Sequence, residues 1–68
     1  MGMVIQLNGA PREIAEGQTV AGLVVELGLL PNQVAVELNQ ELVPREEREG
    51  RALRAGDAVE LVTLVGGG

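Results

Sequence analysis

The first two strands that the sequence predicts are marked by alternating apolar residues. In the segment Met3–Leu7, the apolar residues Met3, Ile5 and Leu7 recur with the period of two that indicates one face of a β-strand. Asn8-Gly9 follows, and both residues tolerate the positive φ angles of a two-residue hairpin turn. We therefore expect a returning strand over Ala10–Ile14. Pro11 within it favours a sheet edge, where no backbone donor is needed.

The next stretch has the period of an α-helix. Its apolar residues recur at i, i+3, i+4 and i+7 and form one stripe: Val20, Leu23, Val24 and Leu27. Thr19 is expected to cap the start of this helix, and Gly28 suits the left-handed position after its last turn. Leu29 is then expected to fold back in a Schellman contact. We interpret Gly22, inside the helix, as a point of close approach to the sheet.

Three more strands are predicted in the second half of the chain. Val34–Leu38 turns at Asn39-Gln40 into a strand that ends before Pro44, and Ala58–Val65 forms the last and longest strand. Between them, Arg45–Arg51 is polar on all sides and predicts a short irregular or single-turn segment. Leu53 is expected to point inward.

These predictions give the order β-β-α-β-β-β, with one helix laid across one face of a mixed five-stranded sheet. A helix on one face of a sheet is a standard solution for a small α+β domain. We place the first and fifth strands side by side and parallel at the centre, which is the β-grasp arrangement. Residues 1–65 are predicted to form this domain, followed by a flexible glycine tail over residues 66–68.

The composition excludes most kinds of active site. The 68-residue chain contains no Cys, His, Tyr, Phe or Trp, and its sequence also lacks Ser and Lys. Nucleophilic catalysis relies mainly on Ser, Cys or Lys, and His is the commonest general base. We therefore expect no catalytic residues, no metal site and no enzymatic activity in this chain alone.

The charge of the chain bears on its partners. A net charge of −5 argues against nucleic acid, whose phosphates require a basic face. No apolar run approaches the length of a membrane span, and the first residues lack the pattern of a signal peptide. We expect a cytoplasmic protein that binds neither nucleic acid nor membrane.

The sequence ends in Gly66, Gly67 and Gly68. One interpretation is a frayed terminus or a leftover linker. The other is a thread slender enough to enter a narrow channel in another protein, because glycine permits close backbone approach. Such a thread would carry one reactive group, the α-carboxylate of Gly68. Composition alone leaves both interpretations open.

Several motifs taken together resemble a known family. They are the Asn8-Gly9 hairpin with Pro11-Arg12, the triplet Val43-Pro44-Arg45, the turn Ala55-Gly56-Asp57 and the terminal diglycine. In this order and at this length they resemble the ThiS family, the ubiquitin-like sulfur carriers of thiamin biosynthesis. The resemblance covers residues 3–68.

The resemblance implies a chemistry for the tail. A ThiF-like adenylyltransferase would use MgATP to convert the Gly68 carboxylate into an acyl-adenylate. Sulfur mobilised by a cysteine desulfurase would then displace AMP and leave a thiocarboxylate, which thiazole synthase would consume. Gly66 and Gly67 would supply reach. ATP and Mg²⁺ would be used by the activating partner, and no cofactor would be bound permanently.

Partner binding requires a surface next to this tail. If alternate residues of the last strand, Val59, Leu61 and Thr63, face the core, then Val62 and Leu64 point outward and suggest a docking patch. The alternative is a bulge that buries both. Four arginines lie in or near the charged segment: Arg45, Arg48, Arg51 and Arg54. They could pair with acidic groups of a partner, but we favour a solvated charged loop.

Two alternative functions remain open. A related carrier that delivers sulfur for molybdopterin or for tRNA thiolation would have the same tail. A ubiquitin-like interaction module would have the same fold and no tail chemistry.

Overall fold

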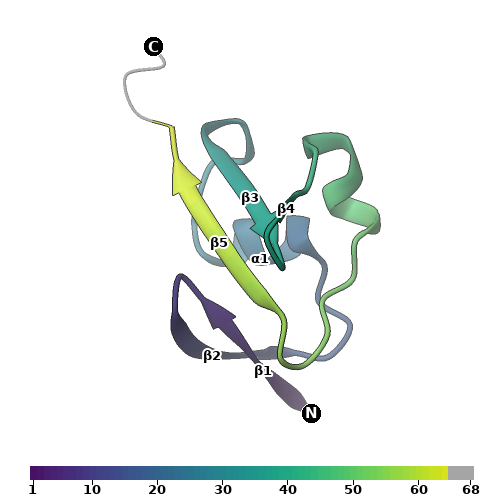
Figure 1. The fold of residues 1–68 in the computed structure, drawn as a ribbon. Helices are drawn as coiled ribbons and strands as arrows, with labels where there is room; N and C mark the ends of the chain where they lie inside the picture. Colours follow the sequence, from purple (N-terminus) through teal and green to yellow (C-terminus); the bar gives the residue numbers. More distant parts are fainter. Residues whose placement is uncertain (65–68) are drawn as a thin grey trace.

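A five-stranded sheet and one α-helix form most of the computed structural model, which describes residues 1–64 (Figure 1). The elements in chain order are β1 (Gly2–Leu7), β2 (Ala10–Ala15), α1 (Val20–Glu26), the 3₁₀ helix η1 (Pro31–Gln33), β3 (Val34–Leu38), β4 (Glu41–Leu42), the 3₁₀ helix η2 (Arg45–Gly50) and β5 (Ala58–Thr63). The predicted order of strands and helix is confirmed. The expectations for Val65 and for the tail of Gly66, Gly67 and Gly68 lie outside the described residues.

The strands lie in the order β2-β1-β5-β3-β4. β5 pairs in parallel with β1, where Gln6 lies beside Ala58, and antiparallel with β3. The predicted parallel pairing of the first and last strands is therefore confirmed, and the sheet is mixed. β5 is the middle strand, so the segment that leads towards the tail runs through the centre of the molecule.

Two tight turns connect the hairpins. Asn8 and Gly9 have φ angles of 50° and 85°, and Asn39 and Gln40 have φ angles of 52° and 72°. Positive φ at both central residues gives the turn a twist that matches the flanking strands. Pro11 lies on the edge strand β2, as its missing backbone donor predicts.

The predicted caps of α1 are present. The Thr19 hydroxyl accepts a hydrogen bond from the Gly22 amide at 3.0 Å. At the other end Gly28 has a φ of 76°, and the Leu29 amide donates to the Val24 carbonyl at 3.1 Å. A second bond, from the Gly28 amide to the Val25 carbonyl at 2.9 Å, completes the Schellman motif.

The interpretation of Gly22 was wrong. A Cβ atom at this position would meet the side chains of Gln18 and Thr19 rather than the sheet. The cause is the cap itself, because Thr19 folds its hydroxyl over the first turn and the Gln18 side chain accepts a bond from the Thr19 amide at 3.1 Å. The absence of a Cβ leaves room for these capping groups.

The core lies between α1 and the inner face of the sheet (Figure 1). It is entirely aliphatic and includes Leu53, which points inward as predicted. Its members are Ile5, Ile14, Val20, Leu23, Val24, Val34, Val36, Leu38, Val43, Leu53 and Val59. Because both the strand and the helix patterns contribute to it, the α+β architecture follows from burying these stripes against each other.

The last strand is shorter than expected. β5 ends at Thr63 and has six residues, the same number as β1 and β2. Beyond Thr63 its neighbour β3 has ended, since Val34 is the first residue of β3 and lies opposite Thr63. The Leu64 amide instead donates to the carbonyl of Gln33 in η1, at 2.7 Å.

Candidate functional site

Side chains alternate between the two faces of β5 as the sequence predicts. Val59 is 1% exposed and Leu61 is half-buried, whereas Val62 and Leu64 are 59% and 53% exposed. The predicted docking residues therefore point away from the core, and β5 has no bulge that buries them. Thr63, expected to face inward, is exposed, so the core-facing row ends at Leu61.

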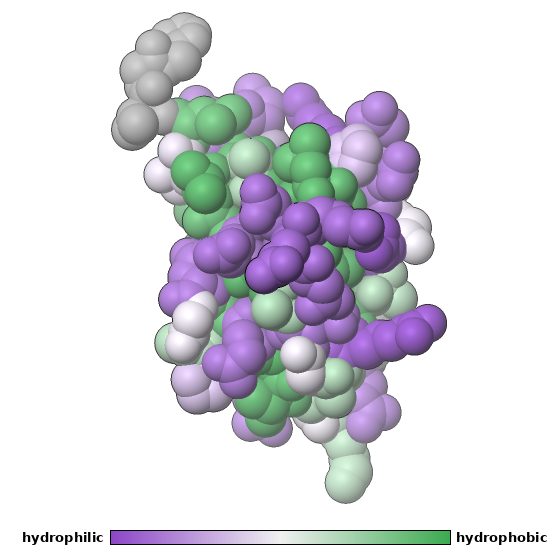
Figure 2. All heavy atoms as spheres, viewed as in Figure 1, coloured by the Kyte–Doolittle hydropathy of each residue, from purple (hydrophilic) through white to green (hydrophobic). Residues whose placement is uncertain are grey.

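Neighbouring strands extend this exposed apolar surface. Ala35 of β3, which is half-buried, lies directly opposite Val62, and Leu42 of β4, which is exposed, lies opposite Glu37 on the same face. Residues directly opposite each other share a face of the sheet. We call Ala35, Leu42, Val62 and Leu64 the open-face patch, because α1 covers the other face. Figure 2 shows hydrophobic residues gathered over the end of β5 and hydrophilic residues across the middle of this view.

An acidic pair borders the open-face patch. Glu37 of β3 lies directly opposite Glu60 of β5, and both side chains are exposed. Like charges directly opposite each other on one face of a sheet are destabilising. A basic group from a partner would relieve this repulsion. The open face is thus suited to a partner surface that is apolar with a basic border.

A hydrogen-bonded turn fixes the point at which the chain leaves the sheet. The Leu64 amide donates to the Gln33 carbonyl in η1 at 2.7 Å. Arg48 of η2, only 6% exposed, donates to the carbonyls on either side of that turn, at 2.9 Å to Pro31 and 2.8 Å to Val34. Arg48 therefore fixes the position of η1, and η1 fixes the position of Leu64.

The expectation of a fully solvated charged loop was wrong for Arg48. The segment forms the 3₁₀ helix η2, which turns this one side chain inward to reach the carbonyls of η1, while Arg45 and Arg54 are exposed and Arg51 is half-buried. No sequence signal separated Arg48 from its neighbours, because every position around it is charged or small.

Asn8 has a role beyond its turn. Its side-chain oxygen accepts a hydrogen bond from the Leu61 backbone amide at 2.9 Å, and its own backbone amide donates to the Val59 carbonyl at 2.9 Å. These bonds continue the contact between β1 and β5 beyond the last paired residues. The turn signal identified Asn8, but nothing in the sequence indicated this longer contact.

Within residues 1–64, no group of three or more acidic side chains is placed to hold a metal ion. No helix in this part of the chain is long and apolar enough to cross a membrane. The groups that the described site offers are thus an apolar patch, an acidic border and an anchored exit point. The predicted reactive residue, Gly68, and its neighbours Gly66 and Gly67 lie outside the described residues.

Comparison with known proteins identifies the family of this chain. The family model described as ThiS family matches residues 5–68, which is nearly the whole chain. The chain belongs to the ThiS family. The resemblance inferred from the sequence motifs is therefore confirmed.

Individual members agree with this assignment. The sulfur carrier protein ThiS of Thermus thermophilus is 43% identical over 65 residues, which cover 96% of this chain and 100% of that protein. The crystal structure of the thiamine biosynthesis protein ThiS from Geobacter metallireducens matches with a TM-score of 0.84 and 36% identity, covering 97% of this chain. The predicted β-grasp fold is confirmed by this match to a ThiS structure.

Larger relatives contain a ThiS-like region. The thiazole synthase of Magnetococcus marinus is 41% identical to this chain over 66 residues, which cover 97% of the chain and 20% of that protein. The chain thus spans about a fifth of the length of the thiazole synthases that it matches.

Proposed function

We propose that this chain is a sulfur carrier for the biosynthesis of the thiazole ring of thiamin. Two observations support the proposal: its membership of the ThiS family and the names of its full-length relatives as sulfur carriers. The composition agrees, because the chain has no Cys, His, Ser or Lys for catalysis of its own. It serves as a protein co-substrate of other enzymes.

The reacting group in this proposal is the α-carboxylate of Gly68. It attacks the α-phosphorus of MgATP in the active site of a ThiF-like adenylyltransferase, and pyrophosphate leaves. A cysteine desulfurase supplies the sulfur as a persulfide, and a thiol reductant provides the two electrons that release it at the oxidation level of sulfide. This sulfur then attacks the acyl carbon and AMP leaves. In this substitution one oxygen is replaced by one sulfur without net oxidation or reduction. Adenylation is needed because a carboxylate oxygen is a poor leaving group.

The partners in this proposal bind the open-face patch. Val62 and Leu64 lie at the end of β5, directly before the tail, so a partner that receives the tail also meets this surface. The opposed Glu37 and Glu60 favour a partner with basic groups around its apolar contact. ThiF-like enzymes and thiazole synthase are the proposed partners. The ThiS-like region found within thiazole synthases supports the second.

Removing the end of the tail tests the proposal. Every core residue lies between Ile5 and Val59, so a chain without Gly67 and Gly68 should fold normally. It should lose ATP–pyrophosphate exchange with a ThiF-like enzyme, because a single remaining glycine is too short to carry the reacting carboxylate into the active site. The control is the chain shortened by one glycine, which still ends in a diglycine and should retain exchange. Circular dichroism would verify folding, and full exchange by the truncated chain would exclude the proposed role.

A further inference from the structure

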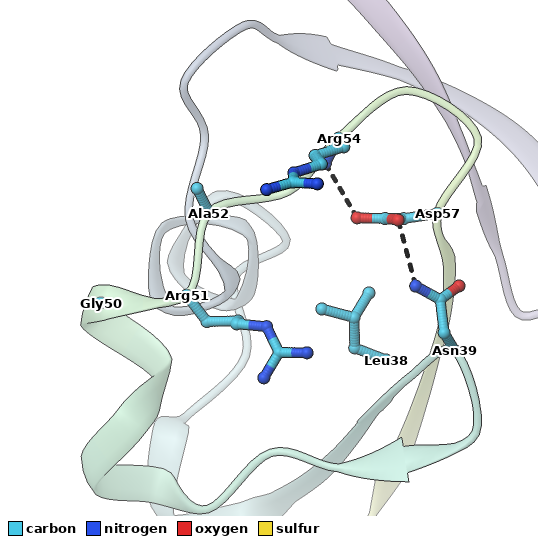
Figure 3. Close-up of a pocket in the computed structure, with 7 residues that line it drawn as sticks. All are labelled: Leu38, Asn39, Gly50, Arg51, Ala52, Arg54 and Asp57. Atoms are coloured by element: carbon cyan, nitrogen blue, oxygen red, sulfur yellow. Dashed lines mark hydrogen bonds between the residues drawn. The ribbon is translucent and has the colours of Figure 1, made fainter.

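A hollow of about 450 Å³ lies near the start of β5 and is lined by two arginines (Figure 3). Its lining comes from the end of β3, from the segment after η2 and from the turn before β5. The lining residues are Leu38, Asn39, Gly50, Arg51, Ala52, Arg54 and Asp57. In Figure 3 the side chains of Arg51 and Arg54 reach into this hollow from two different positions on its wall.

Both arginines lack a carboxylate partner within residues 1–64. The one ion pair in this part of the chain joins Arg12 to Glu26 at 3.4 Å, and the side chains of Arg51 and Arg54 make no hydrogen bond there. The chain has ten acidic and five basic residues, so partners of opposite charge are abundant. Two unpaired guanidinium groups in one hollow therefore form a local positive site on an acidic protein.

The carboxylate in the hollow is already satisfied by neighbouring donors. Asp57 accepts a bond from the Arg54 amide at 2.8 Å and another from the Asn39 side-chain amide at 3.1 Å. These bonds fix the Asp57 carboxylate between Arg54 and Asn39 (Figure 3). The guanidinium groups are left to bind something else.

The walls of the hollow are tied to the rest of the fold. The Arg51 carbonyl accepts from the Val20 amide at 2.9 Å, and Ala52 forms a β-bridge with Thr19. On the other side the Asp57 carbonyl accepts from the Gln6 amide at 2.8 Å. A ligand would meet a site whose backbone is already ordered, which lowers the entropic cost of binding.

From this arrangement we propose that the hollow binds a divalent oxyanion of the phosphate class. The guanidinium group presents a fork of N–H donors that matches phosphate oxygens, and two of them keep the hollow net positive beside the one carboxylate of Asp57. The site lies at the opposite end of β5 from Leu64, so a bound anion leaves the open-face patch and the exit point of the tail uncovered. The proposal is independent of the sulfur-carrier function.

The test is an NMR titration of the isolated chain with inorganic phosphate, at constant ionic strength set with sodium chloride. Amide signals of residues 50–57 should shift and saturate, with half-saturation at about 1–10 mM. Acetate, a monovalent carboxylate probe, should bind at least about five-fold more weakly. Equal or tighter binding of acetate would overturn the assignment to the phosphate class.

Matched variants separate a site from general attraction of anions. Arg51→Gln and Arg54→Gln should each weaken phosphate binding by about five-fold or more. Arg45→Gln makes the same change of net charge at an exposed position outside the hollow, and its effect should stay below about two-fold. If all three variants respond equally, or if the shifts in the unmodified protein do not saturate, the site does not exist. Since no tail chemistry enters this titration, either result leaves the sulfur-carrier proposal unaffected.

Discussion

Arg48 carries a formal charge at a buried position, where little water can reach it. The side chain is 6% exposed, and its guanidinium group is bonded to backbone carbonyls of Pro31 and Val34 rather than to a carboxylate. Burial of an unpaired charge is costly, so these bonds must offset much of that cost. In return they connect η2 to η1, which carries the carbonyl that binds Leu64.

Replacing Arg48 should therefore destabilise the fold more than replacing its exposed neighbour. Arg48→Met keeps much of the apolar stem but leaves two carbonyls without their donors, and it should lower the free energy of unfolding by about 2 kcal/mol. Arg45→Met, at an exposed position of the same 3₁₀ helix, should change it by less than about 0.5 kcal/mol. Urea unfolding followed by circular dichroism measures both.

A second measurement separates a specific link from general destabilisation. If Arg48 positions η1, the Leu64 amide should exchange its hydrogen faster in Arg48→Met than in the unmodified protein, at a urea concentration where both stay folded. Equal stability of the two methionine variants, or unchanged exchange at Leu64, would contradict the proposed connection.

At the scale of the element, β5 shows what the sequence could predict and what it could not. The alternation along the strand correctly placed Val59 inward and Val62 and Leu64 outward, because successive side chains of a strand must point to opposite faces. Its length was overestimated. The apolar run continues to Val65, but the ladder depends on a partner strand, and β3 begins only at Val34.

The contacts of η2 and of Gly22 likewise depend on neighbouring parts of the fold and could not be predicted from the local pattern. A run of charged residues has no apolar period, so only the tertiary contact with η1 distinguishes Arg48 from Arg45 and Arg51. A glycine inside a helix indicates a close approach, but at Gly22 the groups that come close are the capping side chains of Gln18 and Thr19 rather than the sheet. Side-chain contacts of this kind are not encoded in the period of a pattern.

A charge introduced into the open-face patch should weaken partner binding without unfolding the protein. Val62→Glu places a carboxylate in an apolar contact that must lose its water on binding, and affinity for a ThiF-like enzyme should fall by at least about ten-fold. Leu64→Glu should act in the same way. The Val62 side chain is 59% exposed, so the melting temperature should change little.

The matched control lies on α1. Val25 is 66% exposed and lies outside the patch, so Val25→Glu makes the same change of charge and size at a comparable exposure. It should leave the affinity within about two-fold of the unmodified protein. Isothermal titration calorimetry gives both affinities. Equal losses for Val62→Glu and Val25→Glu would show that overall charge, rather than the patch, determines binding.

At the scale of the whole molecule, the order of the elements along the chain and the parallel pairing of β1 with β5 were predictable. Each apolar stripe of this chain fits one secondary structure, and the turn residues Asn8-Gly9 and Gly28 have the positive φ angles that their positions require. When local patterns agree with each other, few arrangements can bury all the stripes. The proposed function was less accessible from the sequence, because in this proposal it depends on the tail and on partners, and the terminal glycines carry no pattern of their own.

The central claim is that Gly68 carries sulfur, and mass spectrometry of the modified chain tests it most directly. The chain is incubated with a ThiF-like enzyme, MgATP, cysteine, a desulfurase and dithiothreitol, in a mixture shown to be active on the sulfur carrier ThiS of Thermus thermophilus. We predict that one oxygen is replaced by one sulfur, that fragmentation assigns the change to Gly68, and that omission of ATP prevents it. Sulfur on a Glu or Asp side chain, or no sulfur in the active mixture, would contradict the account.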